Sequence, residues 1–178
     1  MLLFPAESAA DVAAAAMYGI LLEPLREAVV DLYGADTWEE VRQEASLNCF
    51  QFLTHDTYKE EIFERLVEAV SAVTGTARSD VMEELGGAFV RFVARAGYED
   101  ILRVQGRRLR HFIDGIDNIH EYVRKIYPAM QAPSFRCEDE SETGFTVHYC
   151  SRRAGLATYV VGQLKQVRTG RRMVGDRT

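Results

Sequence analysis

One histidine of this sequence lies within an apolar helix pattern, where an imidazole could do chemistry. Ile116, Ile119 and Val123 recur at the spacing of one helix face, and His120 lies beside them. The charged face of the same helix, which is predicted to be exposed, includes Asp117. A neutral imidazole on such a face can coordinate a metal ion, and in an apolar cavity it can be the axial ligand of a haem iron. The alternative is a core histidine whose ring nitrogens are satisfied by neighbouring groups.

A second group, downstream of this histidine, consists of hydrogen-bond donors at every second position: Tyr149, Ser151 and Arg153. The two-residue period of a strand puts them on the same side as apolar Phe145 and Val147, which is therefore the predicted inward side. Each unpaired buried donor costs roughly 1–3 kcal/mol, so an anionic ligand would satisfy the group. The planar guanidinium suits carboxylates, and haem offers two propionates. The alternative is a strand end that frays into solvent.

The elements that must hold these groups are mostly helices in the first two thirds of the chain. Asp36 and Glu39 have the spacing of a capping box, and Ser79 can cap a later helix. Glycines are expected to end the earlier helices, and Pro128 to end the helix of His120. The expected helices share an apolar face at steps near 3.6 residues and span about residues 20–33, 36–41, 62–74, 79–96 and 107–126.

The pattern changes after Pro133. Residues 134–138 and 145–151 are rich in aromatic and β-branched side chains and are separated by an acidic turn, which predicts a β-hairpin. A last helix is expected from Gly155, and residues 168–178 form a basic tail without periodicity. The expected fold class is therefore α+β, mainly helical with a small antiparallel sheet.

Composition limits the kinds of partner. The chain has 178 residues with 47% hydrophobic side chains, enough for one domain with a proper core. A net charge of -6 argues against electrostatic binding of nucleic acid or anionic lipid. Cys49, Cys137 and Cys150 are odd in number and lack CxxC spacing, which indicates reduced thiols in a cytoplasmic protein. The longest apolar run, residues 12–22, is too short to span a membrane.

Several motifs occur in the order typical of the H-NOX (haem nitric oxide/oxygen binding) domain. The chain is similar to this family over roughly residues 17–167, and it most resembles the N-terminal sensor domain of β-type soluble guanylate cyclases. The motifs that carry the resemblance are Met17-Tyr18-Gly19, Gly97 to Val104, Leu109 to His120, Tyr127-Pro128, Ala132 to Phe135, and the Y-x-S-x-R triplet ending at Arg153.

The resemblance implies a role for each matching residue. His120 matches the proximal ligand of a ferrous haem b iron. Tyr149, Ser151 and Arg153 match the clamp for the haem propionates. Pro133 matches the proline that presses on the porphyrin and distorts it.

On the other side of the haem, the resemblance implies two further positions. Phe89 matches a distal-side aromatic, and Tyr159 falls on the distal helix facing the bound gas, where the NO-selective subunit has an aliphatic residue. In that respect the chain resembles the atypical, oxygen-responsive cyclases of invertebrates, so O2 binding alongside NO is expected. Tyr159 could instead pack in the core or donate to a backbone carbonyl. Cys137 could be a redox-sensitive thiol near the pocket or an inert buried one.

The function implied by the resemblance is a haem gas sensor that regulates cGMP synthesis and pairs with a second cyclase subunit. This chain alone is not expected to be an enzyme. Residues 1–16 are expected to be an extension, because family chains usually begin at the Met-Tyr-Gly run. Residues 168–178 are expected to be a divergent tail, because family domains continue there with two more strands that complete the sheet. The alternatives are a haem-free interaction or dimerisation module and an enzyme in its own right.

Overall fold

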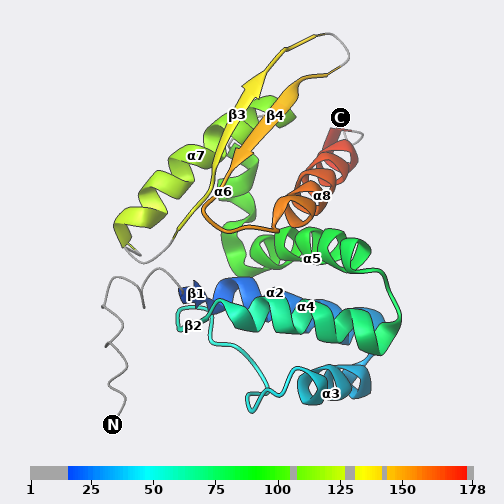
Figure 1. Cartoon of the computed structure of the whole chain (residues 1–178). Helices are drawn as coiled ribbons and strands as arrows, with labels where there is room; N and C mark the ends of the chain where they lie inside the picture. Colours follow the sequence, from blue (N-terminus) through cyan, green and yellow to red (C-terminus); the bar gives the residue numbers. More distant parts are fainter. Residues whose placement is uncertain (1–15, 105–107, 127–130, 142–143, 176–178) are drawn as a thin grey trace.

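The computed structural model describes residues 16–104, 108–126, 131–141 and 144–175 of the chain. Its fold is α+β, as expected, with helices and two small two-stranded antiparallel sheets. The elements, in chain order, are β1 (Ala16–Tyr18), α2 (Gly19–Tyr33), α3 (Ala35–Glu44), β2 (Thr57–Lys59), α4 (Glu61–Thr74), α5 (Arg78–Val93), the π-helical turn η1 (Ala94–Tyr98), α6 (Glu99–Val104), α7 (Leu109–Ile126), β3 (Ser134–Glu138), β4 (Thr146–Cys150) and α8 (Ala157–Gly175). Figure 1 shows α2 to α5 in the lower part of the molecule, and α7 with the β3–β4 hairpin in the upper part.

Two hydrophobic cores correspond to these two parts. The N-terminal core consists of buried side chains of α2, α3, α4 and α5 and includes Tyr159 of α8. The C-terminal core consists of Phe112 and Ile113 of α7 and Val167 of α8, with half-buried residues of β3 and β4 packed against them. Helix α8 therefore contributes to both cores.

Helices α5 and α8 cross closely because each has a glycine at the crossing. A Cβ atom on Gly86 would lie 1.9 Å from the carbonyl oxygen of Tyr159, and one on Gly162 would lie 1.8 Å from the carbonyl oxygen of Glu83. Any larger residue at either position would collide with the backbone of the other helix. The two glycines thus set how near α8 lies to α5.

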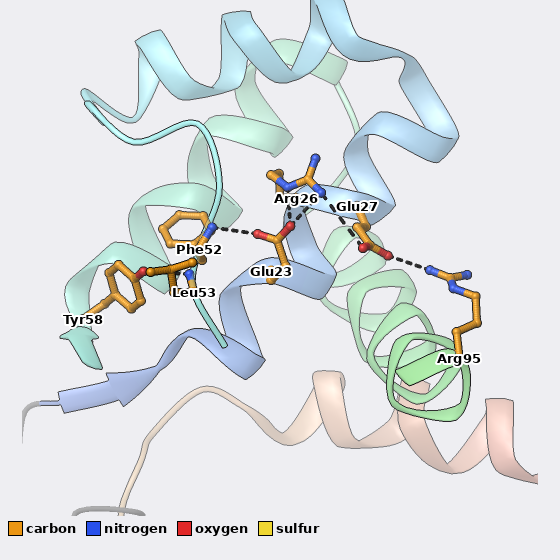
Figure 2. Close-up of polar contacts among 7 residues, drawn as sticks. All are labelled: Glu23, Arg26, Glu27, Phe52, Leu53, Tyr58 and Arg95. Carbon is orange, nitrogen blue, oxygen red and sulfur yellow. Dashed lines mark hydrogen bonds and ion pairs between the residues drawn. The ribbon is translucent and has the colours of Figure 1, made fainter. Parts of the chain in front are cut away.

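Polar side chains of α2 hold neighbouring segments against this helix (Figure 2). The Glu23 carboxylate accepts from the backbone N–H of Phe52 at 2.7 Å and from Arg26 Nε at 2.7 Å. Glu27 pairs with Arg95 at 2.7 Å, which attaches η1 to α2. These contacts hold the loop before β2 and the turn after α5 against the same helix.

The glycine helix ends are confirmed, whereas both proposed side-chain caps are wrong. Gly34 and Gly75 have positive φ angles of 92° and 68° and follow α2 and α4 directly. Helix α3 begins after Gly34, and Glu39 pairs with Arg42 and Gln43 one turn later. Helix α5 begins at Arg78 after Ala77, with no side-chain cap, so Ser79 already lies inside the helix.

The predicted hairpin is confirmed, and the last helix is longer than predicted. Phe135 pairs with Tyr149 in the antiparallel register of β3 and β4, and along β4 half-buried and exposed residues alternate. Helix α8 continues to Gly175, so residues 168–175 are helical although they lack an apolar period. Pro128 lies outside the described residues. None of the described helices is long and apolar enough to cross a membrane.

Candidate functional site

His120 has the hydrogen bond that prepares an imidazole for a metal. Its Nδ1 lies 3.0 Å from the carbonyl oxygen of Pro133. A carbonyl only accepts, so Nδ1 carries the proton and the lone pair is on Nε2. Burial lowers the pKa of His120, outweighing the opposite effects of the Pro133 bond and the Asp117 carboxylate. The side chain is therefore a neutral imidazole with a basic Nε2, which is the form that binds a metal.

Asp117 is a member of this site that the sequence did not reveal. Its carboxylate accepts from the backbone N–H of Phe135 at 3.1 and 3.3 Å, and its Oδ1 lies 3.9 Å from His120 Nδ1. Periodicity assigned Asp117 to the charged outer face of the helix, but its carboxylate faces β3. This contact places the start of β3, and with it Pro133, beside the histidine.

The aromatic ring of Phe135 connects the histidine to the donor group. It lies 6.0 Å from the His120 ring and 5.5 Å from the Tyr149 ring, between centroids. Tyr149 is half-buried on β4, on the inward side that the strand period predicted. Phe135 and Tyr149, on one side of the hairpin, thus continue from His120 of α7.

The end of β4 does not fray into solvent. Ser151 Oγ accepts the backbone N–H of Arg153 at 3.1 Å, and the Arg153 side chain is only 8% exposed. Its guanidinium lies 3.1 Å from a Glu60 carboxylate oxygen and donates to the carbonyl of Gln131 at 3.4 Å. Arg152, in contrast, is exposed. Arg153 is thus a buried cation on the inward side of the segment after β4.

Tyr159 and Phe89 lie together in the N-terminal core. The Tyr159 ring lies 5.7 Å from that of Phe63, edge to face, and 6.2 Å from that of Phe89. Tyr159 is 5% exposed, and its hydroxyl makes no well-formed hydrogen bond among the described residues, although the side chain of Gln163 on the same helix is close enough to act on its pKa. Burial raises the pKa of Tyr159, so the hydroxyl remains protonated and able to donate. The alternative of a bond to a backbone carbonyl is not observed.

The residues expected at the site fall into two groups in the structure. His120, Pro133 and Tyr149 lie together with Phe135 beside the C-terminal core, and Phe89 and Tyr159 lie together in the N-terminal core. A neutral imidazole can bind the iron of a porphyrin, and a buried guanidinium can pair with one of its two carboxylates. The residues present therefore fit a haem group.

The remaining thiols and acids offer no other metal centre. Among the residues that the structure describes, no group of three or more histidine, cysteine, aspartate or glutamate side chains could hold a metal ion. Burial raises the pKa of the Cys137 thiol, which favours its neutral, unreactive form. Of the two alternatives for Cys137, the prediction is therefore the inert thiol.

Comparison with known proteins finds a matching family model and similar sequences. The family model described as haem-NO-binding matches residues 18–170. Soluble guanylate cyclase gcy-33 of Caenorhabditis elegans is 41% identical over 151 residues, which are 85% of this chain and 16% of that protein. Soluble guanylate cyclase 89Da of Drosophila melanogaster is 35% identical over 85% of this chain and 23% of its own length. The chain thus spans less than a quarter of either cyclase.

Solved structures share the fold. The Fe(II) unliganded H-NOX protein from K. algicida has 22% sequence identity and a TM-score of 0.75, with 88% of this chain and 84% of that chain covered. An oxygen-binding H-NOX domain related to soluble guanylate cyclases, in its oxygen complex, has 19% identity and a TM-score of 0.71 over 88% of this chain and 81% of that one. At these identities the likeness establishes the fold alone.

Proposed function

The chain belongs to the haem-NO-binding (H-NOX) family, and on this premise we propose that it is a gas-sensor domain whose haem iron is held by Nε2 of His120. The observation that carries the proposal is the hydrogen bond from His120 Nδ1 to the Pro133 carbonyl. It fixes the tautomer that leaves Nε2 free of a proton. Burial keeps the ring neutral, so the lone pair is available near neutral pH.

The other residues would bind and orient the group. Haem b, when bound, supplies a ferrous iron that takes a diatomic gas. Arg153 would pair with a propionate, and Tyr149 of β4 and Ser151, which follows the strand, would complete the clamp. Pro133, whose carbonyl already holds His120, would lie against the porphyrin and bend it.

Tyr159 and Phe89 would lie on the side of the haem where the gas binds. A buried hydroxyl with no well-formed hydrogen bond among the described residues is suited to donate to bound O2, which gains from a hydrogen-bond donor, whereas NO needs little such help. We therefore propose that the chain binds O2 as well as NO. Phe89 would limit the space beside the Tyr159 ring.

The effect of gas binding would be transmitted by α7. His120, Asp117 and the start of β3 are joined by hydrogen bonds, so a change in the pull on His120 would move the contact between α7 and the hairpin. Like the cyclases it resembles, the full protein would couple this change to cGMP synthesis in the cytoplasm, together with a second cyclase subunit. We assign catalysis to no residue of this chain.

Haem reconstitution followed by an absorption spectrum tests the proposal. The wild-type chain is expected to give a Soret band, and His120→Gly to lose the wild-type ferrous spectrum and partly regain it with imidazole in the buffer. His111→Gly is the matched control, because His111 is exposed on the same helix. An unchanged spectrum in His120→Gly would show that the ligand is another residue. Well-folded wild-type protein without a Soret band would leave the haem-free interaction module.

A further inference from the structure

The ion pair between Arg153 and Glu60 joins residues far apart in the sequence. Glu60 Oε1 lies 3.1 Å from Arg153 Nε, and the Arg153 side chain is 8% exposed while that of Glu60 is 33% exposed. A guanidinium buried to this degree is costly without a counter-ion. Glu60 supplies that counter-ion from another part of the chain.

The backbone of Glu60 is held on both sides. The residue follows β2 directly, and β2 pairs with β1 in a register that includes Met17 opposite Tyr58. It also immediately precedes α4, where the first turn favours a negative charge. Its carboxylate is therefore presented by two ordered elements, in contrast to an acid on a long loop.

The segment after β4 lies against these same elements. A pocket of about 420 Å³ is lined by Met17 of β1, by Glu60, by Phe63 of α4 and by residues 154–156 of this segment. In Figure 1 this segment passes from the hairpin in the upper part of the molecule towards α8 and α5. The Glu60–Arg153 pair thus joins the hairpin to the N-terminal part at the position where the segment passes between them.

We propose that Glu60 is a positioning residue for haem binding, which acts by holding the guanidinium of Arg153 in the orientation that receives a propionate. The inference rests on the proposed function. An arginine has five N–H donors in a fixed plane. The Glu60 charge beside Nε, together with the Gln131 carbonyl that accepts from Nη1, therefore orients the guanidinium and leaves donors for a second carboxylate. An arginine fixed in advance loses less side-chain freedom when the ligand binds, which slows ligand loss.

The test compares haem loss from four proteins: wild type, Glu60→Gln, Arg153→Gln and the double variant. Each is loaded with haem, and transfer of the haem to excess apomyoglobin is followed by absorption. Glu60→Gln is expected to lose haem about fivefold faster than wild type, and to have no further effect in the Arg153→Gln background, because residues that act through one another are not additive. A Glu60→Gln effect that persists undiminished in the Arg153→Gln background would overturn the proposal.

Matched variants separate this role from a general effect of charge or stability. Glu61→Gln removes the adjacent acid, whose carboxylate is 63% exposed and pairs only loosely with Lys59 at 3.8 Å. It is expected to lose haem at the wild-type rate, and equal loss from Glu60→Gln and Glu61→Gln would refute the inference. Glu60→Asp keeps the charge on a shorter side chain and is expected to fall between wild type and Glu60→Gln, which keeps the test open if the amide variant folds poorly.

The two proposals fail in different ways. If wild-type protein takes up no haem, the proposed function fails and this inference falls with it. If wild-type protein binds haem but Glu60→Gln releases it at the wild-type rate, only the role of Glu60 is wrong. Cooperative thermal unfolding of each variant without haem shows whether a faster loss comes from a less stable fold.

Discussion

Two neighbouring arginines after β4 have different surroundings. The Arg153 side chain is 8% exposed and lies beside Glu60, whereas Arg152 is exposed. Strand β4 ends at Cys150, so both arginines lie in the bend after it, where only Arg153 is turned towards Glu60. Substituting either arginine by alanine therefore removes the same charge, but only the Arg153 variant removes a buried side chain.

We expect Arg153→Ala to lose haem about tenfold faster than wild type, and Arg152→Ala to behave like wild type. The reason is that hydrogen bonds to charged groups contribute about 1.5–3 kcal/mol, and 1.4 kcal/mol corresponds to a factor of ten. Haem transfer to apomyoglobin measures the rates. Similar loss from both variants would indicate a nonspecific electrostatic effect and no clamp.

The buried hydroxyl of Tyr159 leads to a prediction with two readouts. An unsatisfied buried hydroxyl costs roughly 1–3 kcal/mol, so Tyr159→Phe should stabilise the haem-free chain by about 1 kcal/mol. The same variant should release O2 faster from the reconstituted ferrous protein if the hydroxyl donates to the gas. Urea unfolding and stopped-flow O2 release measure the two effects.

Tyr122→Phe is the control for Tyr159→Phe, because Tyr122 is 65% exposed on α7. It should change neither stability nor O2 release. A stabilised Tyr159→Phe with unchanged O2 release would assign Tyr159 to packing alone.

Only part of the site could be predicted from the sequence. His120 and the alternation of Tyr149, Ser151 and Arg153 follow from local periods and from the motif of the family. Glu60 could not be found in this way, because its contact with Arg153 depends on how β2 and α4 pack beside a segment far along the chain. Asp117 was missed because its position in the helix pattern predicted an exposed side chain. In the structure its carboxylate accepts a hydrogen bond from a backbone N–H of β3.

At the scale of elements, helix ends at glycine were predictable and side-chain caps were not. A positive φ angle selects glycine by sterics alone, so Gly34 and Gly75 are reliable ends. Asp36 and Ser79 have the residue types of N-caps, but both lie inside their helices, because α3 begins at Ala35 and α5 at Arg78. The short pairing of β1 with β2 was also missed, because each strand has three residues and almost no period.

The crossing of α5 and α8 predicts a large effect from a small substitution. Gly162→Ala would place a Cβ atom 1.8 Å from the carbonyl oxygen of Glu83, so the helices would have to separate. We expect a loss of about 1–3 kcal/mol in the free energy of unfolding, as for other overpacked sites. Urea unfolding measures it.

Gly170→Ala is the matched control on the same helix. A Cβ atom there would have no neighbour within 4 Å, and alanine is a better helix former than glycine by about 1 kcal/mol. This variant should therefore be slightly more stable than wild type. Two alanine variants with the same effect on stability would show that the close crossing is not maintained in solution.

At the scale of the whole molecule, contacts from several elements join the two cores. Helix α8 has Tyr159 in the N-terminal core and Val167 in the C-terminal core, and the ion pair of Glu60 with Arg153 makes a second connection. The residues proposed to bind haem come from both sides: His120 and Arg153 from the hairpin side, Phe89 and Tyr159 from the N-terminal core. A ligand held by both groups would link the two cores more strongly than either contact does.

Haem should therefore stabilise the whole fold, and not only the neighbourhood of His120. A ligand that binds only the folded chain adds about 2.7 kcal/mol at a free concentration one hundred times its Kd, which for a chain of this size raises Tm by about 5–10 °C. Thermal unfolding at increasing haem concentration measures the rise, which should follow the logarithm of the concentration. His120→Gly should show a smaller rise, and imidazole should restore part of it. A single unfolding transition whose Tm rises with haem concentration would show that both cores are stabilised together. An early transition whose Tm does not depend on haem would show that the N-terminal core does not contact the ligand.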